Sequence, residues 1–195
     1  IDVGSFKMPD GFDKKAYMKS LSDTTDAKLI VSVGRLSMQK NPLFAVEIIA
    51  ELAKLRNDFK YIWVGGGELE NDAKNKAKQL NVSDKIVFTG VRTDVKEILA
   101  CCDCFLMPSL FEGLPFSLVE AQAAGLTCIV SDVVTKEANV GLTEYFPLER
   151  GAASWAKLIN QTLDEPKRTA DGGKLALFDI SNTVCQLEEI YDKLK

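Results

Sequence analysis

The stretch "CDCFLMPSLFEGLPFSLVEAQAAGLTCIVSD" (Cys102–Asp132) indicates how the chain folds. Its apolar runs Cys104–Ser109 and Thr127–Asp132 are typical of buried strands. Between them lies a loop with a glycine and a proline, and then a mostly apolar helix that we expect to end at Gly125, which suits the position after a helix. A strand, a helix and a strand in this order predict a unit with parallel strands.

The same alternation extends over most of the chain. The strand candidates are short, and most carry β-branched or aromatic residues on both faces, which favours parallel strands covered on both sides. They are Leu29–Gly34, Tyr61–Gly65, Lys85–Gly90, Cys104–Ser109, Thr127–Asp132 and Glu144–Leu148. Helices are expected after Asn41-Pro42, with Asn41 as the cap, and over Glu68–Leu80, Val95–Cys102 (capped by Thr93 or Asp94), Trp155–Leu163 and Val184–Leu194. This order predicts an α/β fold with a doubly wound, Rossmann-like parallel sheet.

The chain divides into three expected parts. Residues 1–22 are polar and read as an irregular linker or entry segment, 23–178 as the Rossmann-like domain, and 179–195 as a C-terminal helix. The first residue is Ile1 and not Met, so we expect a longer parent protein.

Composition excludes several classes of function. The chain is 46% hydrophobic with a net charge of −4, which fits a globular protein and argues against a nucleic-acid partner. The absence of histidine removes the usual general base and the Ser-His and Cys-His nucleophiles. Cys101 and Cys104 have the spacing of a redox or zinc motif, but without a second pair or any histidine we interpret Cys101, Cys102 and Cys104 as packing residues. Reduced thiols and the lack of a membrane-length apolar run favour the cytoplasm.

Ligands of doubly wound sheets bind outside the carboxyl ends of the strands. Arg35 and Lys40 follow the first strand and suit a diphosphate, although a solvated basic pair explains them equally well. Gly65-Gly66-Gly67 follows the second strand and fits neither dinucleotide nor P-loop motifs, so it is a turn that either approaches a ligand or simply joins a strand to a helix.

Two carboxylates flank the helix start in the opening stretch. Glu112 lies in the loop, and Glu120 lies about one turn into the helix, whose first amides suit a phosphate. An ionised carboxylate only accepts hydrogen bonds, and a ribose diol donates two. The two carboxylates are therefore compatible with a binding site for a nucleotide-linked sugar. They are about equally compatible with structural roles, Glu112 as an exposed acid of the loop and Glu120 as a carboxylate that caps backbone amides.

The chain resembles the C-terminal, donor-binding half of family 4 glycosyltransferases of the GT-B fold. The matching segments are Val31–Pro42, Trp63–Glu70, Val87–Val95, Cys102–Gly125 and Cys128–Asp132, with the E-x7-E element Glu112–Glu120 as the family's hallmark, and "IDVGSF" at the start resembles the interdomain linker. The family often has a proline where this chain has Leu126-Thr127. The resemblance implies catalytic roles for Arg35, Lys40 and Glu112: the two cations hold the diphosphate and Glu112 faces the donor sugar.

The resemblance also implies that Glu120 holds the ribose and that Val91 and Arg92 lie against the base. The full set of implied donor-binding residues is Gly34, Gly66, Gly67, Val91, Arg92, Gly113, Leu114, Pro115, Phe116, Ser117, Leu118 and Glu120. No D-x-D motif occurs, so neither a metal nor another cofactor is expected.

The activity expected from this resemblance is retaining hexosyl transfer from a nucleotide-sugar, with UDP favoured, to a glycan or lipid-linked glycan in polysaccharide or envelope synthesis. The acceptor is expected on an N-terminal domain outside this chain, and the full protein at the inner face of the membrane as a peripheral protein. Two alternatives stay open. A nucleotide-sugar epimerase of the same fold would require acid/base residues in the cleft, and a non-catalytic α/β module would bind without transfer.

Overall fold

A computed structural model describes residues 1–6, 8, 11–165 and 170–193. It contains strands β1 (Lys28–Val33), β2 (Phe59–Val64), β3 (Ile86–Gly90), β4 (Cys104–Met107), β5 (Thr127–Ser131) and β6 (Thr143–Phe146). Its helices are α1 (Lys14–Ser22), α2 (Pro42–Ala53), α3 (Glu70–Gln79), α4 (Val95–Cys101), α5 (Phe116–Ala123), α6 (Gly151–Asp164), α7 (Gly172–Ala176) and α8 (Ile180–Lys193). Short 3-10 turns occupy Val3–Phe6, Met38–Lys40, Ser83–Lys85, Lys136–Ala138 and Leu148–Arg150.

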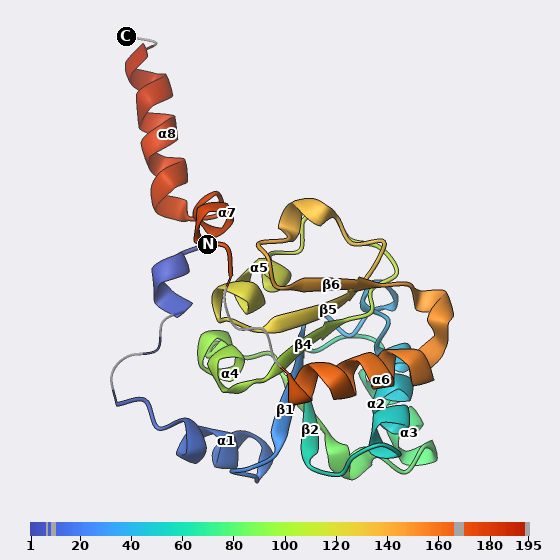
Figure 1. The fold of residues 1–195 in the computed structure, drawn as a ribbon. Coiled ribbons are helices and arrows are strands. Elements are labelled where there is room, and N and C mark those ends of the chain that lie inside the picture. Colours follow the sequence, from blue (N-terminus) through green and yellow to red (C-terminus); the bar gives the residue numbers. More distant parts are fainter. Residues whose placement is uncertain (7, 9–10, 166–169, 194–195) are drawn as a thin grey trace.

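The six strands form one parallel sheet in the order β3-β2-β1-β4-β5-β6 (Figure 1). The chain builds outward from β1 to β3 and then returns to β4 on the other side of β1. The strand order therefore reverses between β1 and β4, where Ile30 pairs with Cys104. The predicted doubly wound, Rossmann-like sheet is confirmed.

Helices cover both faces of the sheet, and each face has its own hydrophobic core. Successive residues of a strand point to opposite faces, so Ile30 packs with α2, α3 and α6, whereas Leu29 and Val31 pack with α1, α4 and α5 (Figure 1). Trp155 of α6 is fully buried between the rings of Phe44 and Phe146. This double covering explains why the strands lack an alternating polar face.

The N-terminal segment is partly helical, which corrects the expectation that residues 1–22 are irregular. Helix α1 begins after Asp13, whose carboxylate accepts a hydrogen bond from the Ala16 amide at 3.0 Å. Met18 of α1 and Phe6 before it are buried in the core that α4 and α5 share. This segment is therefore packed on the domain.

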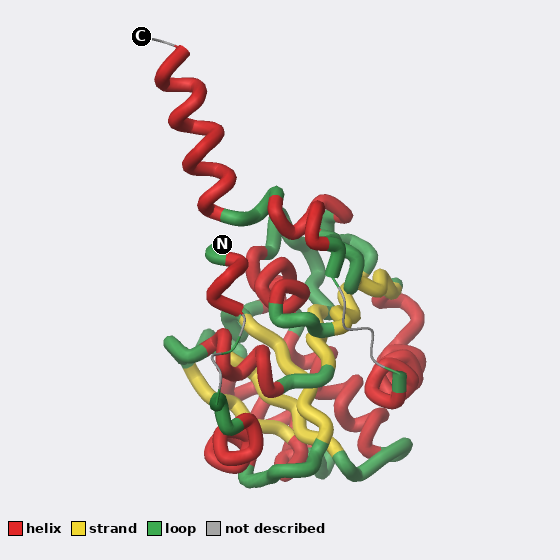
Figure 2. The backbone as a smooth tube through the Cα atoms, turned by 60° about the vertical axis from the view of Figure 1, so that its left-hand side comes forward, coloured by secondary structure: helices red, strands yellow, loops and turns green. Residues whose placement is uncertain are grey.

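The last helix projects away from the rest of the domain (Figures 1 and 2). Helix α8 begins at Ile180, one turn before the predicted start at Val184, and the predicted end at Leu194 lies outside the described residues. Its start is joined to the first residue of the chain, because the Ile180 amide donates to the Ile1 carbonyl at 2.8 Å. The chain therefore leaves the domain for α8 beside residue 1.

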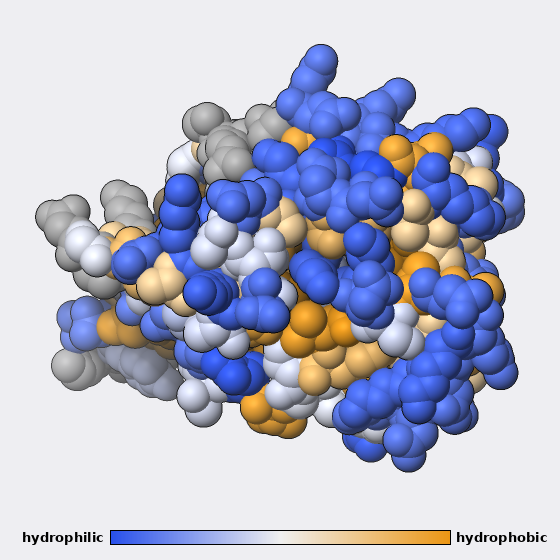
Figure 3. Space-filling view, turned by 90° about the horizontal axis from the view of Figure 1, so that it is seen from below, coloured by the Kyte–Doolittle hydropathy of each residue, from blue (hydrophilic) through white to orange (hydrophobic). Residues whose placement is uncertain are grey.

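Among the described residues, no helix combines the length and apolarity needed to cross a bilayer. The face seen in Figure 3 is mostly hydrophilic, and apolar residues reach it in small groups.

Candidate functional site

The candidate site lies where the strand order reverses. The loop after β1 and the loop after β4 leave the sheet at the same edge, because the two strands are parallel neighbours. Such a switch point is the usual ligand position in doubly wound sheets. The first loop carries Arg35 and Lys40, and the second carries Glu112.

Lys40 and Glu112 meet directly in this crevice. The Lys40 Nζ lies 2.5 Å from Glu112 Oε1, and the two side chains are only 17% and 5% exposed. A charge-assisted bond in a place so poorly hydrated is stronger than one at the surface. Gly34 makes room for it: a Cβ at this position would lie 2.9 Å from the Lys40 Cε. The predicted cation and the predicted sugar-facing carboxylate therefore form one unit.

Arg35 does not join this unit. Its Nε lies 3.0 Å from Glu68 Oε2, and the two side chains are 74% and 54% exposed. Such a surface pair is worth at most about 1 kcal/mol, so Arg35 can exchange Glu68 for an anionic ligand at little cost.

Helix α5 presents its N-terminus to the same crevice. Pro115 occupies the cap position without a side-chain acceptor, and the amides of Phe116 and Ser117 have no acceptor within the helix. The Leu118 amide donates to the Pro115 carbonyl at 3.0 Å, and its side chain is buried. Two helical amides, and not the three expected from the sequence, are thus without an acceptor inside the helix.

The loop before α5 is open to solvent, with Gly113 and Leu114 exposed. Nothing lies within 4 Å of the position that a Cβ at Gly113 would occupy. The backbone at Gly113 is therefore accessible to a ligand.

Glu120 lies one turn further along α5 and is partly buried. Burial raises the pKa of its carboxyl group above the ordinary value, and the charges of the N-terminal ammonium group and of Lys96 oppose this shift. Among the described residues, none donates a hydrogen bond to this carboxylate or forms an ion pair with it. The expected structural alternative, a carboxylate that caps backbone amides, is thus not seen, and the partly buried carboxylate is available to a ligand that donates hydrogen bonds.

The glycines after β2 serve mainly to pack two loops together. A Cβ at Gly65 would lie 2.2 Å from the Gly34 carbonyl oxygen, and one at Gly67 would lie 2.4 Å from that of Leu36. At Gly66 the nearest atom would be 3.9 Å away. The close approach of the loops explains why Gly65 and Gly67 are glycines. It does not explain Gly66, which is the one of the three where contact with a ligand could account for the glycine.

The predicted base-side residues lie after β3, at the same edge of the sheet. Val91 is 86% exposed. Arg92 donates two hydrogen bonds to the Asp94 carboxylate, from its Nε to Oδ1 at 2.7 Å and from its Nη2 to Oδ2 at 2.5 Å. The Tyr17 hydroxyl of α1 donates to Oδ2 of the same carboxylate at 2.5 Å. The Arg92 guanidinium holds the pKa of Asp94 well below its usual range. The Asp94 carboxylate is therefore occupied by these two side chains: Asp94 stands at the predicted N-cap position of α4, but its side chain makes no capping hydrogen bond.

The sequence analysis missed two residues that join the site loops. The Gln39 amide nitrogen lies 3.1 Å from Glu112 Oε2, and that of Asn41 lies 3.1 Å from the Pro108 carbonyl oxygen. Asn41 stands at the predicted N-cap position of α2, directly before Pro42, but its side chain reaches across to the β4 loop and makes no capping hydrogen bond. No sequence signal distinguishes these amides from ordinary polar loop residues.

The cysteine cluster is buried, as the packing interpretation requires. Cys101 and Cys102 lie in the core on one face of the sheet and Cys104 in the core on the other. Burial raises the pKa of all three thiols, that of Cys101 to about 11. Within the described residues, no group of three or more potential ligands is placed to hold a metal ion.

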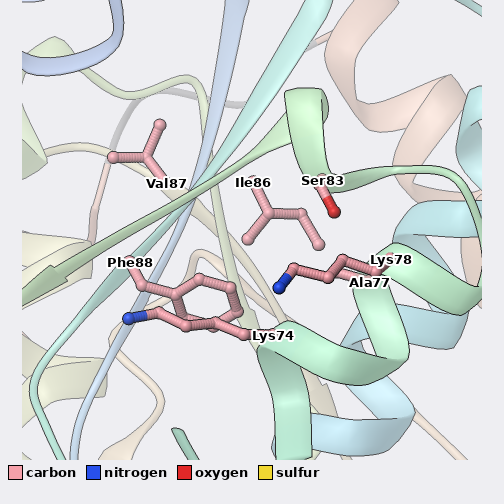
Figure 4. Close-up of a pocket in the computed structure, with 7 residues that line it drawn as sticks. All are labelled: Lys74, Ala77, Lys78, Ser83, Ile86, Val87 and Phe88. Carbon is pink, nitrogen blue, oxygen red and sulfur yellow. The ribbon is translucent and has the colours of Figure 1, made fainter. Parts of the chain in front are cut away.

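A separate groove of about 380 Å³ lies at the far edge of the sheet, between α3 and β3 (Figure 4). Phe88 and Ile86 form its apolar part, and Lys74 and Lys78 of α3 border it. None of its lining residues belongs to the predicted site. It is thus distinct from the crevice at β1 and β4.

The fold and the switch-point crevice agree with the comparisons to known proteins. The chain belongs to the family "Glycosyl transferases group 1", whose model matches residues 13–176. A putative glycosyltransferase, EpsF of Bacillus subtilis, is 34% identical over 164 residues, which cover 83% of this chain and 41% of that protein. An Escherichia coli UDP-Gal:alpha-D-GlcNAc-diphosphoundecaprenol alpha-1,3-galactosyltransferase is 42% identical over 104 residues, which cover 52% of this chain and 27% of that protein.

Among solved structures, HepE from Anabaena in complex with UDP and glucose superimposes with a TM-score of 0.78 at 19% identity. The superposition covers 99% of this chain and 55% of HepE. The chain therefore has the Rossmann-like fold of one half of a GT-B glycosyltransferase, and it spans less than half the length of the two curated relatives named above.

Proposed function

We propose that this chain is the donor-binding half of a retaining family 4 glycosyltransferase that uses a UDP-sugar. The observation that carries the proposal is the placement of Lys40, Glu112 and the free N-terminus of α5 in one crevice at the switch point. A cation, two helical amides and a carboxylate together match a ligand that has both a diphosphate and sugar hydroxyls. Membership of the glycosyltransferase family supports the same reading.

In this proposal the diphosphate lies against Lys40 and the amides of Phe116 and Ser117, and Arg35 leaves Glu68 to join it. Negative charge develops on the diphosphate as the sugar bond breaks, and cations and amides that are already oriented stabilise it without reorganisation. Glu112 accepts a hydrogen bond from a sugar hydroxyl. Glu120 accepts hydrogen bonds from the ribose diol.

The acceptor is proposed to bind to a second domain of a longer protein. Helix α8 supports this, because Ile180, Val184, Leu187 and Ile190 are exposed and lie at helical spacing along one face of it. The acceptor is a glycan or a lipid-linked glycan, as the name of the Escherichia coli relative suggests for that protein. The proposed location of the longer protein is the cytoplasmic face of the membrane.

The test is calorimetric titration of the chain with UDP and with GDP in EDTA. Binding in EDTA is expected, because side-chain cations and amides neutralise the diphosphate without a metal. At about one hundred times the dissociation constant, a ligand stabilises the folded state by roughly 2.7 kcal/mol, which thermal unfolding can detect.

The substitution Glu120→Gln should lower the affinity for UDP by roughly ten- to a hundredfold, because one ribose hydroxyl then faces an amide NH₂. The exposed residue Glu149 provides the matched control, Glu149→Gln. Binding that requires Mg²⁺ or Mn²⁺ would refute the metal-free proposal, and the absence of binding to either nucleotide would refute the proposed function.

A further inference from the structure

Gln39 contacts the proposed sugar-facing carboxylate from the side opposite Lys40. It lies in the 3-10 turn Met38–Lys40, directly before Lys40. Its amide nitrogen donates to Glu112 Oε2 and to the Phe111 carbonyl oxygen, at 3.1 Å each. Both hydrogens of this amide group are thus used on the loop that carries Glu112.

The two neighbours together hold both oxygens of the carboxylate. Lys40 binds Oε1 at 2.5 Å and Gln39 binds Oε2. A carboxylate that is held through one oxygen can rotate about its last bond, whereas one held through both has a fixed plane. Each oxygen keeps a second lone pair, and the direction of these lone pairs is then set by the protein.

The two loops are also joined by contacts that do not use the Gln39 side chain. The Leu110 amide donates to the Gln39 carbonyl oxygen at 2.8 Å, and the Asn41 side chain donates to the Pro108 carbonyl at 3.1 Å. Replacing the Gln39 amide group therefore leaves the loops connected. It removes the hydrogen bond to Glu112 Oε2 and the one to the Phe111 carbonyl oxygen.

We propose that Gln39 is a positioning residue that orients Glu112 toward the hydroxyls of the donor sugar. The inference rests on the proposed function, since it takes Glu112 as the residue that meets the sugar. Gln39 acts through Glu112 and touches neither the nucleotide nor the diphosphate. Its side chain therefore affects binding of the intact sugar nucleotide and not of the bare nucleotide.

The test compares Gln39→Met with the wild-type chain in titrations with UDP, UDP-glucose, UDP-galactose and UDP-N-acetylglucosamine. Met has a similar length and no donor. We expect an unchanged affinity for UDP, within about twofold, and roughly tenfold weaker binding of the sugar nucleotide that the wild type binds best, the low end for a lost hydrogen bond to a charged group. The exposed residue Gln161 of α6 gives the matched control, Gln161→Met, which should bind all four ligands as the wild type does.

A double variant separates positioning from direct contact. In a Glu112→Ala background there is no carboxylate to orient, so adding Gln39→Met should cause no further loss of sugar-nucleotide affinity. The same tenfold loss in both backgrounds would overturn the inference, because Gln39 would then act independently of Glu112. Gln39→Asn, which keeps the amide but is too short to reach Glu112, serves as the second variant if Gln39→Met has a lowered melting temperature.

The outcomes also separate this inference from the proposed function. Wild-type affinity for the sugar nucleotides in Gln39→Met would overturn the inference alone. No binding of UDP by the wild-type chain would overturn the proposed function and the inference with it.

Discussion

The close packing of the loops after β1 and β2 predicts that Gly67→Ala destabilises the domain. The new methyl group would lie 2.4 Å from the Leu36 carbonyl oxygen and 2.6 Å from its amide nitrogen. Both atoms belong to the backbone and cannot rotate away, so the loops must separate. Separation weakens two hydrogen bonds of 2.9 Å, from the Leu36 amide to Gly66 and from the Leu69 amide to Leu36. With each bond worth about 0.5–1.5 kcal/mol and the displacement added, we expect a loss of roughly 2–3 kcal/mol.

Thermal unfolding followed by calorimetry measures this loss. For a domain of this size, 1 kcal/mol corresponds to about 2–4 °C, so the melting temperature of Gly67→Ala should fall by roughly 4–12 °C. The neighbouring variant Gly66→Ala is the matched control: its methyl group would come no closer than 3.9 Å to Glu70, and we expect a change below about 0.5 kcal/mol. A Gly67→Ala protein that melts within about 2 °C of the wild type would refute the reasoning. Weaker UDP binding by Gly66→Ala at unchanged stability would indicate a ligand contact at Gly66.

Three further predictions concern charge and thiols. Because burial raises the pKa of Glu120 in the folded state, the wild-type free energy of unfolding should fall as pH rises from the ordinary to the raised pKa; urea unfolding between pH 4 and pH 7 should show this fall, and its persistence in Glu120→Gln would contradict the assignment. Lys40→Met should cost roughly 2–4 kcal/mol in the same assay by leaving Glu112 buried without its partner, whereas Lys54→Met at an exposed pair should cost less than about 1 kcal/mol; equal losses would contradict the burial of the first pair. A thiol reagent at pH 8 should label only Cys185 in the folded chain, because the other four cysteines are buried with raised pKa values; rapid labelling of a second thiol would show that the cysteine cluster is accessible.

Elements whose residues are buried on both sides were predictable from the sequence. Each predicted strand is present within two residues of its expected ends. The inner strands β1, β2, β4 and β5 are buried almost throughout, as expected of central parallel strands, whereas the edge strands β3 and β6 are only partly buried. Helix α3 begins at Glu70 and not at Glu68, because Glu68 lies opposite Arg35 and the Leu69 amide is used by Leu36. Such boundaries depend on contacts from another loop, which periodicity does not reveal.

Helix α1 was missed for a similar reason. Its sequence is polar, and its signals are the Asp13 cap and Met18, its one buried apolar residue. The surface that Met18 packs against is made by α4 and α5, far along the chain. The helix therefore depends on tertiary burial that its own residues do not indicate.

The meeting of the two loops that carry the candidate residues was predictable, but the pairing of their side chains was not. The rule for strand ends selects the loops that carry Lys40 and Glu112. The contact between these residues, and that of Gln39 with the same carboxylate, depends on side-chain conformations across 72 or 73 residues of chain. Roles for Val91 and Arg92 at the base stay predictions, because no contact of theirs in the structure tests them.

Because β1 lies in the middle of the sheet, one of its edges stays unpaired for part of the time that the chain is being synthesised. Strand β1 leaves the ribosome long before β4, its second partner, since Ile30 pairs with Cys104. At about 5–20 residues per second, the inner edge of β1 stays open for roughly 4–15 s while β2 and β3 can already pair beside it. During that interval the nascent chain presents an unpaired strand with apolar faces, which other chains can join. Chaperone binding should therefore be strongest on ribosome-bound chains that end between β3 and β4.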